Sequence, residues 1–468
     1  MAAPASATSG ARDAGESATS TGHRGAVSDP VEDSYYPEQG DPGVDTLHYG
    51  LRLTWHADKR VLQGRAAVTF RATTSAKAFQ LDLGDPLRVR RITLAPARLP
   101  DAAVRVPFTH RGTTLRVTAP VVRDQRYRLV VGYRGTPDTV KAPTSRTDFH
   151  GLGWHTRKDG QVWTMQEPFG AYTWYPVNDQ PSDKAYYDLR VDVPGKWVGV
   201  SNGELVKRRS RDGRTITRFH NHAPMSSYLM TLAIGPYQRH RQTGPHGLPM
   251  SYWLPEGSPR LLRPLRHTPD VMRWLEQRLG RYPFDRVGIV VTPSESAMET
   301  QTMVTFGKGN YDYGRRTVRR TVVHELAHQW YGDTVTPRDW RDVWMNEGMA
   351  TYLEARWAAD QGWTTWRHAR HEWRRDDGLW REIYGPPGAY HRNRFAAINV
   401  YYCPALMLAR LRGKVGADEF DRLVRRWPQT HLNANASRHT FVRWWERRTG
   451  KELSRFFHRW LMSPDSPA

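Results

Sequence analysis

The sequence predicts an α+β protein in which a β-rich region precedes a largely helical one. The chain has 468 residues, too many for one ordinary hydrophobic core, so two or three domains are expected. Between residues 44 and 245, apolar and polar residues alternate over many short stretches, which is the period of half-buried strands. From residue 246 onward, apolar residues recur at three- and four-residue spacing, which is the period of helices.

Residues 1–43 are predicted to form a disordered tail. Up to about residue 33 they are rich in Ala, Ser, Thr and Gly and show no apolar periodicity. They also lack the apolar stretch of about 7–15 residues that a signal peptide needs. The sequence as written therefore suggests a cytoplasmic protein, and an extracellular one is expected if the N-terminus has been processed. No apolar run approaches the ~18 residues of a membrane span, so we expect a soluble protein.

Strands are expected throughout the first domain, residues 44–245. Turn sequences divide this region into short segments, for example Gly-Thr-Pro at 135–137 and Ser-Asn-Gly at 201–203. Apolar side chains on every second residue would bury one face of each strand. The alternation is clearest at 47–55, 66–70, 127–133 and 187–193.

The second domain, residues 246–468, is expected to be mainly helical. Thr268 as N-cap and Pro269 at the first helical position open a helix that Gly280 closes. The apolar run at 287–291 is typical of a buried strand. Helical periodicity near the end of the chain predicts helices at 417–427, 441–448 and 453–462.

Two histidines, His324 and His328, stand four residues apart, and Glu325 follows the first of them. On a helix the histidines project from one face and can bind one metal ion, while Glu325 is directed at water bound to that ion. This motif alone also arises by chance on amphipathic helices. Glu347, 19 positions after His328, favours the metal site, because a helix-loop-helix can bring its carboxylate to the histidines. Three protein ligands leave a fourth position for water, as in a catalytic zinc site. Apolar residues at helical spacing support the first helix: Val318, Val322, Val323, Leu326, Ala327 and Trp330.

The formal net charge is +22 and the isoelectric point is near 10.2. This charge fits either a protein that binds nucleic acid or another anionic surface, or an arginine-rich composition that affects every exposed position. Because arginines are scattered through all segments, we favour the second explanation. The single cysteine, Cys403, excludes an intramolecular disulfide and is interpreted as a packed thiol.

The segment from His324 to Glu354 contains His-Glu-Leu-Ala-His-Gln-Trp-Tyr-Gly-Asp and then Asn-Glu-Gly-Met-Ala-Thr-Tyr-Leu-Glu. It closely resembles the gluzincin zinc aminopeptidases of the aminopeptidase N and leukotriene hydrolase family, and the resemblance extends over most of residues 44–468. It implies a saddle-like antiparallel β-domain that packs over a thermolysin-like catalytic domain with a helical C-terminal part. Longer members carry a further β-sandwich and a large helical domain, so this chain is expected to be a minimal two-domain member with a more open cleft.

Upstream of the histidines, Ser296-Ala297-Met298-Glu299-Thr300 is similar to the family's exopeptidase signature Gly-x-Met-Glu-Asn. The resemblance implies that Glu299 binds the free amino terminus of the substrate, with Ala297 and Met298 in the same substrate site. Ser296 and Thr300 replace the glycine and the asparagine of the signature.

Further upstream, Thr-Met-Gln-Glu-Pro at 164–168 is similar to the family stretch Thr-Gln-x-Glu-Pro. The resemblance implies that Glu167 is a second amine-binding carboxylate, and Met165 stands where the family has glutamine. Without the resemblance, a carboxylate such as Glu167 would be interpreted as a solvated surface charge. Glu354 is expected to pack beside the site or to support a ligand rather than to bind the metal.

Downstream of the histidines, Val-Tyr-Tyr-Cys-Pro-Ala at 400–405 is similar to the family segment Val-Tyr-x-x-Gly-Ala. The resemblance implies that Tyr401 is the catalytic tyrosine, with Tyr402 as the alternative. Taken alone, Tyr401 would be interpreted as an ordinary core residue. Pro404 replaces the glycine of the family segment.

The expected function is that of a zinc-dependent aminopeptidase, which hydrolyses the N-terminal peptide bond of peptides through a zinc-activated water. Glu325 would take the proton from water, and Tyr401 would help the metal to stabilise the oxyanion. Two alternatives remain open: a thermolysin-like zinc endopeptidase without the amine anchor, and a non-catalytic basic scaffold or nucleic-acid binder on the same fold. We expect one catalytic zinc ion as cofactor and peptides with a free N-terminus as partners, without specific nucleic acid and without a transmembrane segment.

Overall fold

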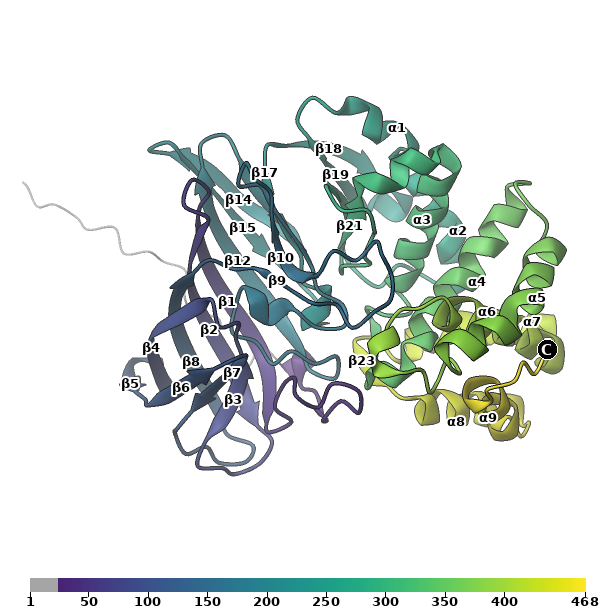
Figure 1. Ribbon diagram of the computed structural model, residues 1–468, viewed down its shortest axis with the longest axis horizontal. Coiled ribbons are helices and arrows are strands. Elements are labelled where there is room, and N and C mark those ends of the chain that lie inside the picture. Colours follow the sequence, from purple (N-terminus) through teal and green to yellow (C-terminus); the bar gives the residue numbers. More distant parts are fainter. Residues whose placement is uncertain (1–23) are drawn as a thin grey trace, which may run out of the picture.

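A computed structural model describes residues 24–468, in which a β-rich region is followed by a smaller sheet and then by helices (Figure 1). The predicted α+β class is confirmed, since strands dominate up to Pro255 and helices dominate after it. Within these described residues, no helix is long and apolar enough to cross a membrane. The first 23 residues of the predicted tail lie outside the described range.

A nine-stranded sheet forms the side of the molecule that is farthest from the helices (Figure 1). Its strands pair in the order β14-β15-β12-β1-β2-β8-β4-β5, with β16 on β12, and β1 runs parallel to β12. Alternate apolar side chains are buried, as predicted, so each strand contributes one face to the core. The strands are β1 (Val44–His56), β2 (Val61–Ala72), β4 (Leu87–Pro96), β5 (Val104–Arg105), β8 (Arg126–Gly135), β12 (Lys184–Pro194), β14 (Glu204–Arg211), β15 (Arg214–His220) and β16 (Met225–Ser226).

Two smaller sheets complete the β-rich region. The five-stranded sheet, in the order β13-β17-β11-β10-β9, carries the loop between β9 and β10 toward the helices (Figure 1). The three-stranded sheet has the order β3-β7-β6. These strands are β3 (Phe79–Asp82), β6 (Phe108–Arg111), β7 (Thr114–Val117), β9 (Thr139–Val140), β10 (Leu152–Thr156), β11 (Val162–Met165), β13 (Val198–Ser201) and β17 (Leu232–Gly235).

A four-stranded sheet begins the second half of the chain. It consists of β18 (Tyr237–Thr243), β19 (Pro249–Pro255), β20 (Val287–Thr292) and β21 (Met303–Gly307), with β19, β20 and β21 parallel. All six residues of β20 are buried, which agrees with the predicted buried strand. Because β18 pairs with β19, this sheet starts before residue 246, and the division of the chain at that point stays a prediction.

Nine helices lie in the described part of the chain, and α3 and α4 form its centre (Figure 1). The first predicted helix begins at Thr268, one residue earlier than expected, and ends before Gly280, whose φ is +83°. Two short strands, β22 (Val335–Pro337) and β23 (Ala434–Ala436), pair among the helices. The helices are α1 (Leu262–Leu265), α2 (Thr268–Leu279), α3 (Arg315–His328), α4 (Trp344–Asp360), α5 (Trp366–Tyr384), α6 (Asn399–Val415), α7 (Ala417–Thr430), α8 (Arg438–Thr449) and α9 (Ser454–Met462).

Helix α5 was not predicted, because charged residues occupy two of its core positions. Its buried residues are Ala369, Trp373, Asp377 and Arg381, which recur every four residues. The carboxylate of Asp377 lies 2.9 Å from Nε of Arg381, and both side chains are fully buried. Because a buried ion pair stands where apolar residues are expected, the apolar period is hidden in the sequence.

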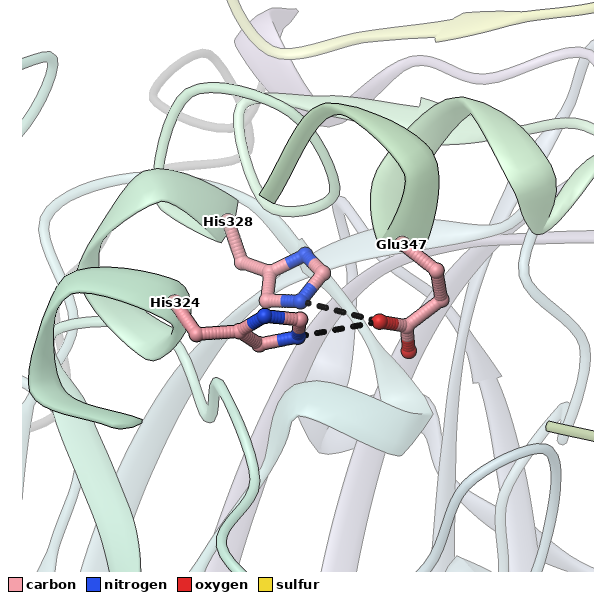
Figure 2. A group of neighbouring side chains, drawn as sticks. All are labelled: His324, His328 and Glu347. Atoms are coloured by element: carbon pink, nitrogen blue, oxygen red, sulfur yellow. Dashed lines mark hydrogen bonds and ion pairs between the residues drawn. The ribbon is translucent and has the colours of Figure 1, made fainter. Parts of the chain in front are cut away.

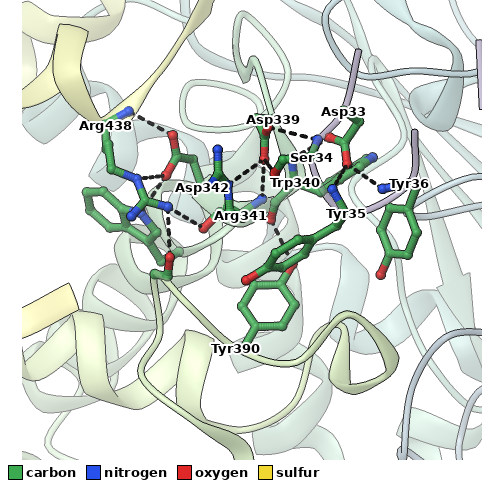
Figure 3. Close-up of polar contacts among 12 residues, drawn as sticks. Asp33, Ser34, Tyr35, Tyr36, Asp339, Trp340, Arg341, Asp342, Tyr390 and Arg438 are labelled. Atoms are coloured by element: carbon green, nitrogen blue, oxygen red, sulfur yellow. Dashed lines mark hydrogen bonds and ion pairs between the residues drawn. The ribbon is translucent and has the colours of Figure 1, made fainter. Parts of the chain in front are cut away.

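Residues 24–43 are not a disordered tail, contrary to the prediction, but join the two halves of the molecule (Figure 3). The backbone and side chain of Ser34 donate to the carboxylate of Asp339 at 3.0 and 2.8 Å. The backbone N–H of Trp340 donates to Asp33 at 2.7 Å. Tyr36 is buried and donates to the carbonyl of Arg392 at 2.7 Å. The local composition gave no sign of this order, because the residues that hold the segment lie more than 300 positions away in the chain.

The register of the nine-stranded sheet places five basic residues next to one another across neighbouring strands. Lys207, Arg218, Arg190, Arg52 and Arg65 are successive partners across β14, β15, β12, β1 and β2. Directly opposed residues point to the same face, where like charges destabilise a sheet by up to about 1 kcal/mol per pair. Arginines that are scattered along the sequence are therefore neighbours in space.

Candidate active site and metal centre

Helices α3 and α4 bring three donor side chains to one point (Figure 2). His324 and His328 lie on one face of α3, while Val322 and Leu326 bury another face in the core. Oε2 of Glu347, in the first turn of α4, lies 3.1 Å from Nε2 of His324 and 3.4 Å from Nε2 of His328. Ligand atoms about 2.05 Å from a tetrahedral ion lie about 3.3 Å apart, so this donor set fits zinc.

The remaining ring nitrogens of the two histidines have partners of their own. Nδ1 of His324 lies 3.3 Å from Glu354, which also accepts from Nε of Arg320 at 2.8 Å. Nδ1 of His328 lies 3.1 Å from the carbonyl oxygen of Tyr331. When Nδ1 donates in this way, the lone pair of each ring is left on Nε2, as a metal ligand requires. The contact of Glu354 agrees with the supporting position expected for it.

Burial and neighbouring charges shift the pKa values of Glu347 and Glu325 in opposite directions. Burial alone would raise the pKa of Glu347, but His328 and His324 outweigh it and hold the pKa well below its usual range. Burial raises the pKa of Glu325 to about 8, although the two histidines act in the opposite direction. Glu347 is therefore ionised and suited to bind a cation, while Glu325 is suited to exchange a proton near neutral pH.

A cavity of about 650 Å³ opens beside these residues. Its lining includes Glu325, Glu299, Glu167, Ala297 and Tyr401, so most of the predicted site residues share one space. Met298 does not line it in the described structure. Because its backbone pairs with β21, alternate side chains of the loop point to opposite sides, and Met298 is buried in the core.

Glu167 and Glu299 are buried carboxylates from different halves of the chain. Each has one oxygen, Oε1, that finds no hydrogen-bond partner among the described residues. Burial raises the pKa of Glu167 well above its usual range, and the charge of Glu299 adds to this effect. Burial also raises the pKa of Glu299, against the influence of His328. Two buried acids with free oxygens form a pocket that a cation would stabilise.

Two residues that depart from the family stretches, Thr300 and Met165, have partners in the fold. Thr300 is buried and donates its hydroxyl to the carbonyl of Met303. Gln329, which follows His328 in the chain, donates to the carbonyl of Glu299 at 2.9 Å and so ties this loop to the end of α3. Met165 lies beside Ser294, whose hydroxyl is 3.0 Å from its sulfur.

Comparison with known families agrees with this arrangement. A model of the Peptidase M1 N-terminal domain matches residues 45–229, and a model of the Peptidase family M1 domain matches residues 263–460. The chain belongs to Peptidase family M1. The family resemblance is therefore confirmed, and the zinc cofactor is supported by both the family and the donor set.

Glutamyl aminopeptidase of Homo sapiens is 28% identical over 330 residues, which are 66% of this chain and 34% of the human protein. Leukotriene A-4 hydrolase of Xenopus laevis is 26% identical over 329 residues, 66% of this chain and 51% of that protein. The matches thus span between a third and about half of the length of these M1 relatives.

Solved M1 structures match over nearly their whole length. A mutant of the M1 zinc metallopeptidase from Deinococcus radiodurans, bound to the substrate Tyr-Ser-Ala, has a TM-score of 0.82 and 27% identity. The match covers 94% of this chain and 99% of that one. A two-domain M1 zinc metallopeptidase bound to L-arginine gives the same values of TM-score, identity and coverage.

The tyrosine predicted from the M1 resemblance lies in α6. The ring of Tyr401 stacks on His324 with 5.9 Å between ring centres, and Tyr402 stacks on Trp380 at 5.1 Å. Pro404 is inside α6, and Gly348 of α4 lies so close to it that a Cβ there would be 2.6 Å from the proline ring. The glycine in α4 therefore makes room for the proline in α6. Cys403 is buried, as expected of a packed thiol.

One residue of this M1 site was missed in the sequence. Arg146, in the loop between β9 and β10, donates to the hydroxyl of Tyr401 at 2.8 Å. No motif or periodicity surrounds it, and 255 positions separate the two residues. Only the fold could reveal this contact.

Proposed function

We propose that the protein is a zinc-dependent aminopeptidase that removes the first residue of peptides with a free amino terminus. The observation that carries the proposal is the pair Glu167 and Glu299, buried on the cavity beside the metal-binding residues, each with an unpaired oxygen. A substrate ammonium group would satisfy both oxygens. Since this pocket accepts the end of a chain, it limits cleavage to the first peptide bond.

The charge of the cavity supports a cationic group on the substrate. Among the lining residues, all in the described part of the chain, Arg146 is the one arginine or lysine. The acids that line the cavity are Asp148, Glu167, Glu295, Glu299, Asp312, Glu325, Glu347 and Glu354. The site is therefore acidic although the protein as a whole carries a charge of +22.

Each residue of the site would have a distinct role in hydrolysis. His324, His328 and Glu347 would hold the zinc ion, which supplies Lewis-acid chemistry at the scissile carbonyl and at water. Glu325 would accept the proton from the attacking water and deliver it to the departing amine. The hydroxyl of Tyr401 would donate a hydrogen bond to the oxyanion that forms at the carbonyl.

The proposal is tested with purified protein and matched peptides. A tripeptide with a free amino terminus should be cleaved after its first residue, and its N-acetylated twin should be left intact. Product masses identify the bond that is cut, and Glu325→Gln serves as the inactive control. Efficient internal cleavage of the acetylated peptide would instead establish a thermolysin-like endopeptidase. Zinc-loaded protein that cleaves neither peptide would favour the non-catalytic scaffold, and its binding to DNA could then be measured against salt concentration.

A solved relative indicates which peptides to try first. The Deinococcus radiodurans M1 structure was bound to Tyr-Ser-Ala, so short peptides with an aromatic first residue are a suitable start. A panel of aminoacyl amidomethylcoumarins would then define the preferred first side chain.

A further inference from the structure

The loop between β9 and β10 extends from the β-rich region toward the helices (Figure 1). The side chain of Arg146, in this loop, lines the catalytic cavity. Its Nη1 donates to the hydroxyl oxygen of Tyr401 at 2.8 Å. Nε and Nη2 donate to the two carboxylate oxygens of Asp148 at 3.0 and 2.6 Å, and Nη2 also donates to Oγ of Ser296 at 3.3 Å. The guanidinium carbon lies 4.5 Å from the ring centre of Phe149. The guanidinium is therefore held from several sides.

The contact decides where the proton of Tyr401 can point. A tyrosine hydroxyl has one proton to donate. Since its oxygen accepts from Arg146, the proton is directed away from the arginine. No acceptor for it exists among the described residues, so the proton is available to a substrate in the cavity.

The donors of Arg146 are nearly all in use, which argues against a role in binding a substrate carboxylate. A guanidinium has five N–H groups, and four of them take part in the contacts with Asp148, Tyr401 and Ser296. Bidentate hydrogen bonding to a carboxylate needs two parallel N–H groups. The single remaining N–H cannot provide it.

We propose that Arg146 is the positioning residue of Tyr401, which orients the hydroxyl so that its proton meets the oxyanion of the substrate. The proposal rests on the proposed aminopeptidase function. It makes the β-rich region part of the active site, because the loop that supplies Arg146 precedes the catalytic sheet. It also gives Ser296, the residue that replaces a glycine of the family signature, a partner in this network.

The test combines Arg146→Met with Tyr401→Phe and measures kcat and KM on an aminoacyl amidomethylcoumarin, a substrate that has the free amino group but no carboxylate. Arg146→Met alone should lower kcat by about 10- to 100-fold with little change in KM, as for other residues that orient a catalytic group. In the Tyr401→Phe background the same change should cost nothing further, because the hydroxyl that it orients is gone. Arg146→Lys should retain more turnover than Arg146→Met, since an ammonium group can still donate to the hydroxyl.

Two further variants keep the test decisive. Asp148→Asn, which loosens the arginine without removing it, should lower kcat in the same way and by less. Arg157→Met is the matched control, because Arg157 pairs with Asp159 at 3.4 Å in the same region and does not line the cavity. Zinc content and melting temperature should be unchanged in all of these variants.

Several results would overturn the proposal. Equal losses from Arg146→Met with and without Tyr401→Phe would mean that the arginine acts independently of the tyrosine. A rise in KM confined to peptides with a free C-terminal carboxylate, and absent for their amides, would mean that it binds the substrate. Loss of zinc in both Arg146→Met and Asp148→Asn would mean that the pair is structural. Wild-type protein that cleaves no substrate would instead refute the proposed function itself.

Discussion

Replacing Glu299 with glutamine should lower kcat/KM for a free-amine substrate by about 100-fold while zinc stays bound. Glu299 is 3% exposed, and one of its carboxylate oxygens has no partner in the described structure, so a substrate ammonium would pair with it out of contact with water. Breaking such a buried pair costs about 3–5 kcal/mol. Because Glu167 remains to share the ammonium, the lower figure applies, and about 3 kcal/mol corresponds to about a 100-fold change.

The assay compares initial rates on a free-amine tripeptide for the wild type, Glu299→Gln and a matched control. Glu295→Gln is that control, because Glu295 lies in the same loop and lines the same cavity but is 60% exposed. Glu295 lies 3.4 Å from His150 in an exposed ion pair, and exposed ion pairs contribute little to stability. Its replacement should therefore change kcat/KM by less than about threefold, which corresponds to roughly 0.6 kcal/mol.

The amine anchor would be refuted by either of two results. The first is a kcat/KM of Glu299→Gln that equals that of Glu295→Gln within experimental error, which would mean that the buried charge contributes nothing. Alternatively, the acetylated peptide could be cleaved as fast as its free-amine twin by the wild type. Zinc analysis of each variant separates these results from simple loss of the metal.

Three further predictions concern the metal, the tyrosine and a buried lysine. His324→Ala should lose zinc, whereas Glu325→Gln should keep zinc and lose turnover, as measured by metal analysis and initial rates. Loss of zinc in both variants would exclude Glu325 as the general base. Tyr401→Phe should lower kcat by about 10²-fold with little change in KM, and normal turnover would exclude Tyr401 as an oxyanion donor. Burial lowers the pKa of Lys184 to about 7, so between about pH 7 and 10 the folded chain holds fewer protons than the unfolded one. The contribution of Lys184 to the free energy of unfolding therefore rises as the pH increases from about 7 to about 10, and this gain is lost as the pH falls back to 7. The free energy of unfolding of the wild type relative to Lys184→Met should therefore increase by about 3 kcal/mol from pH 7 to pH 10 in urea titrations. A difference independent of pH would show that the lysine is charged throughout.

Much of the fold could be predicted because its signals are local. The alternation along β1 and β12 and the run of β20 depend on neighbouring residues, and the structure contains each of these strands. Prediction failed where the local signal is hidden by buried charges or where distant contacts order a segment. Helix α5 buries the ion pair of Asp377 and Arg381 in place of apolar residues. Residues 24–43 are ordered by contacts with the chain around Asp339.

The candidate metal ligands could be read from the linear sequence, because two histidines four residues apart on a helix share one face and the glutamate follows on the next helix. The family could be recognised in the same way, since that motif and the stretches around Glu299 and Tyr401 are continuous in the chain. The rest of the site depends on how the β-rich region packs against the helices. Glu167 and Glu299 become a pair, and Arg146 reaches Tyr401, through the packing of the β-rich region against the helices. Such contacts depend on how separate elements dock, and no period or spacing along the chain encodes them.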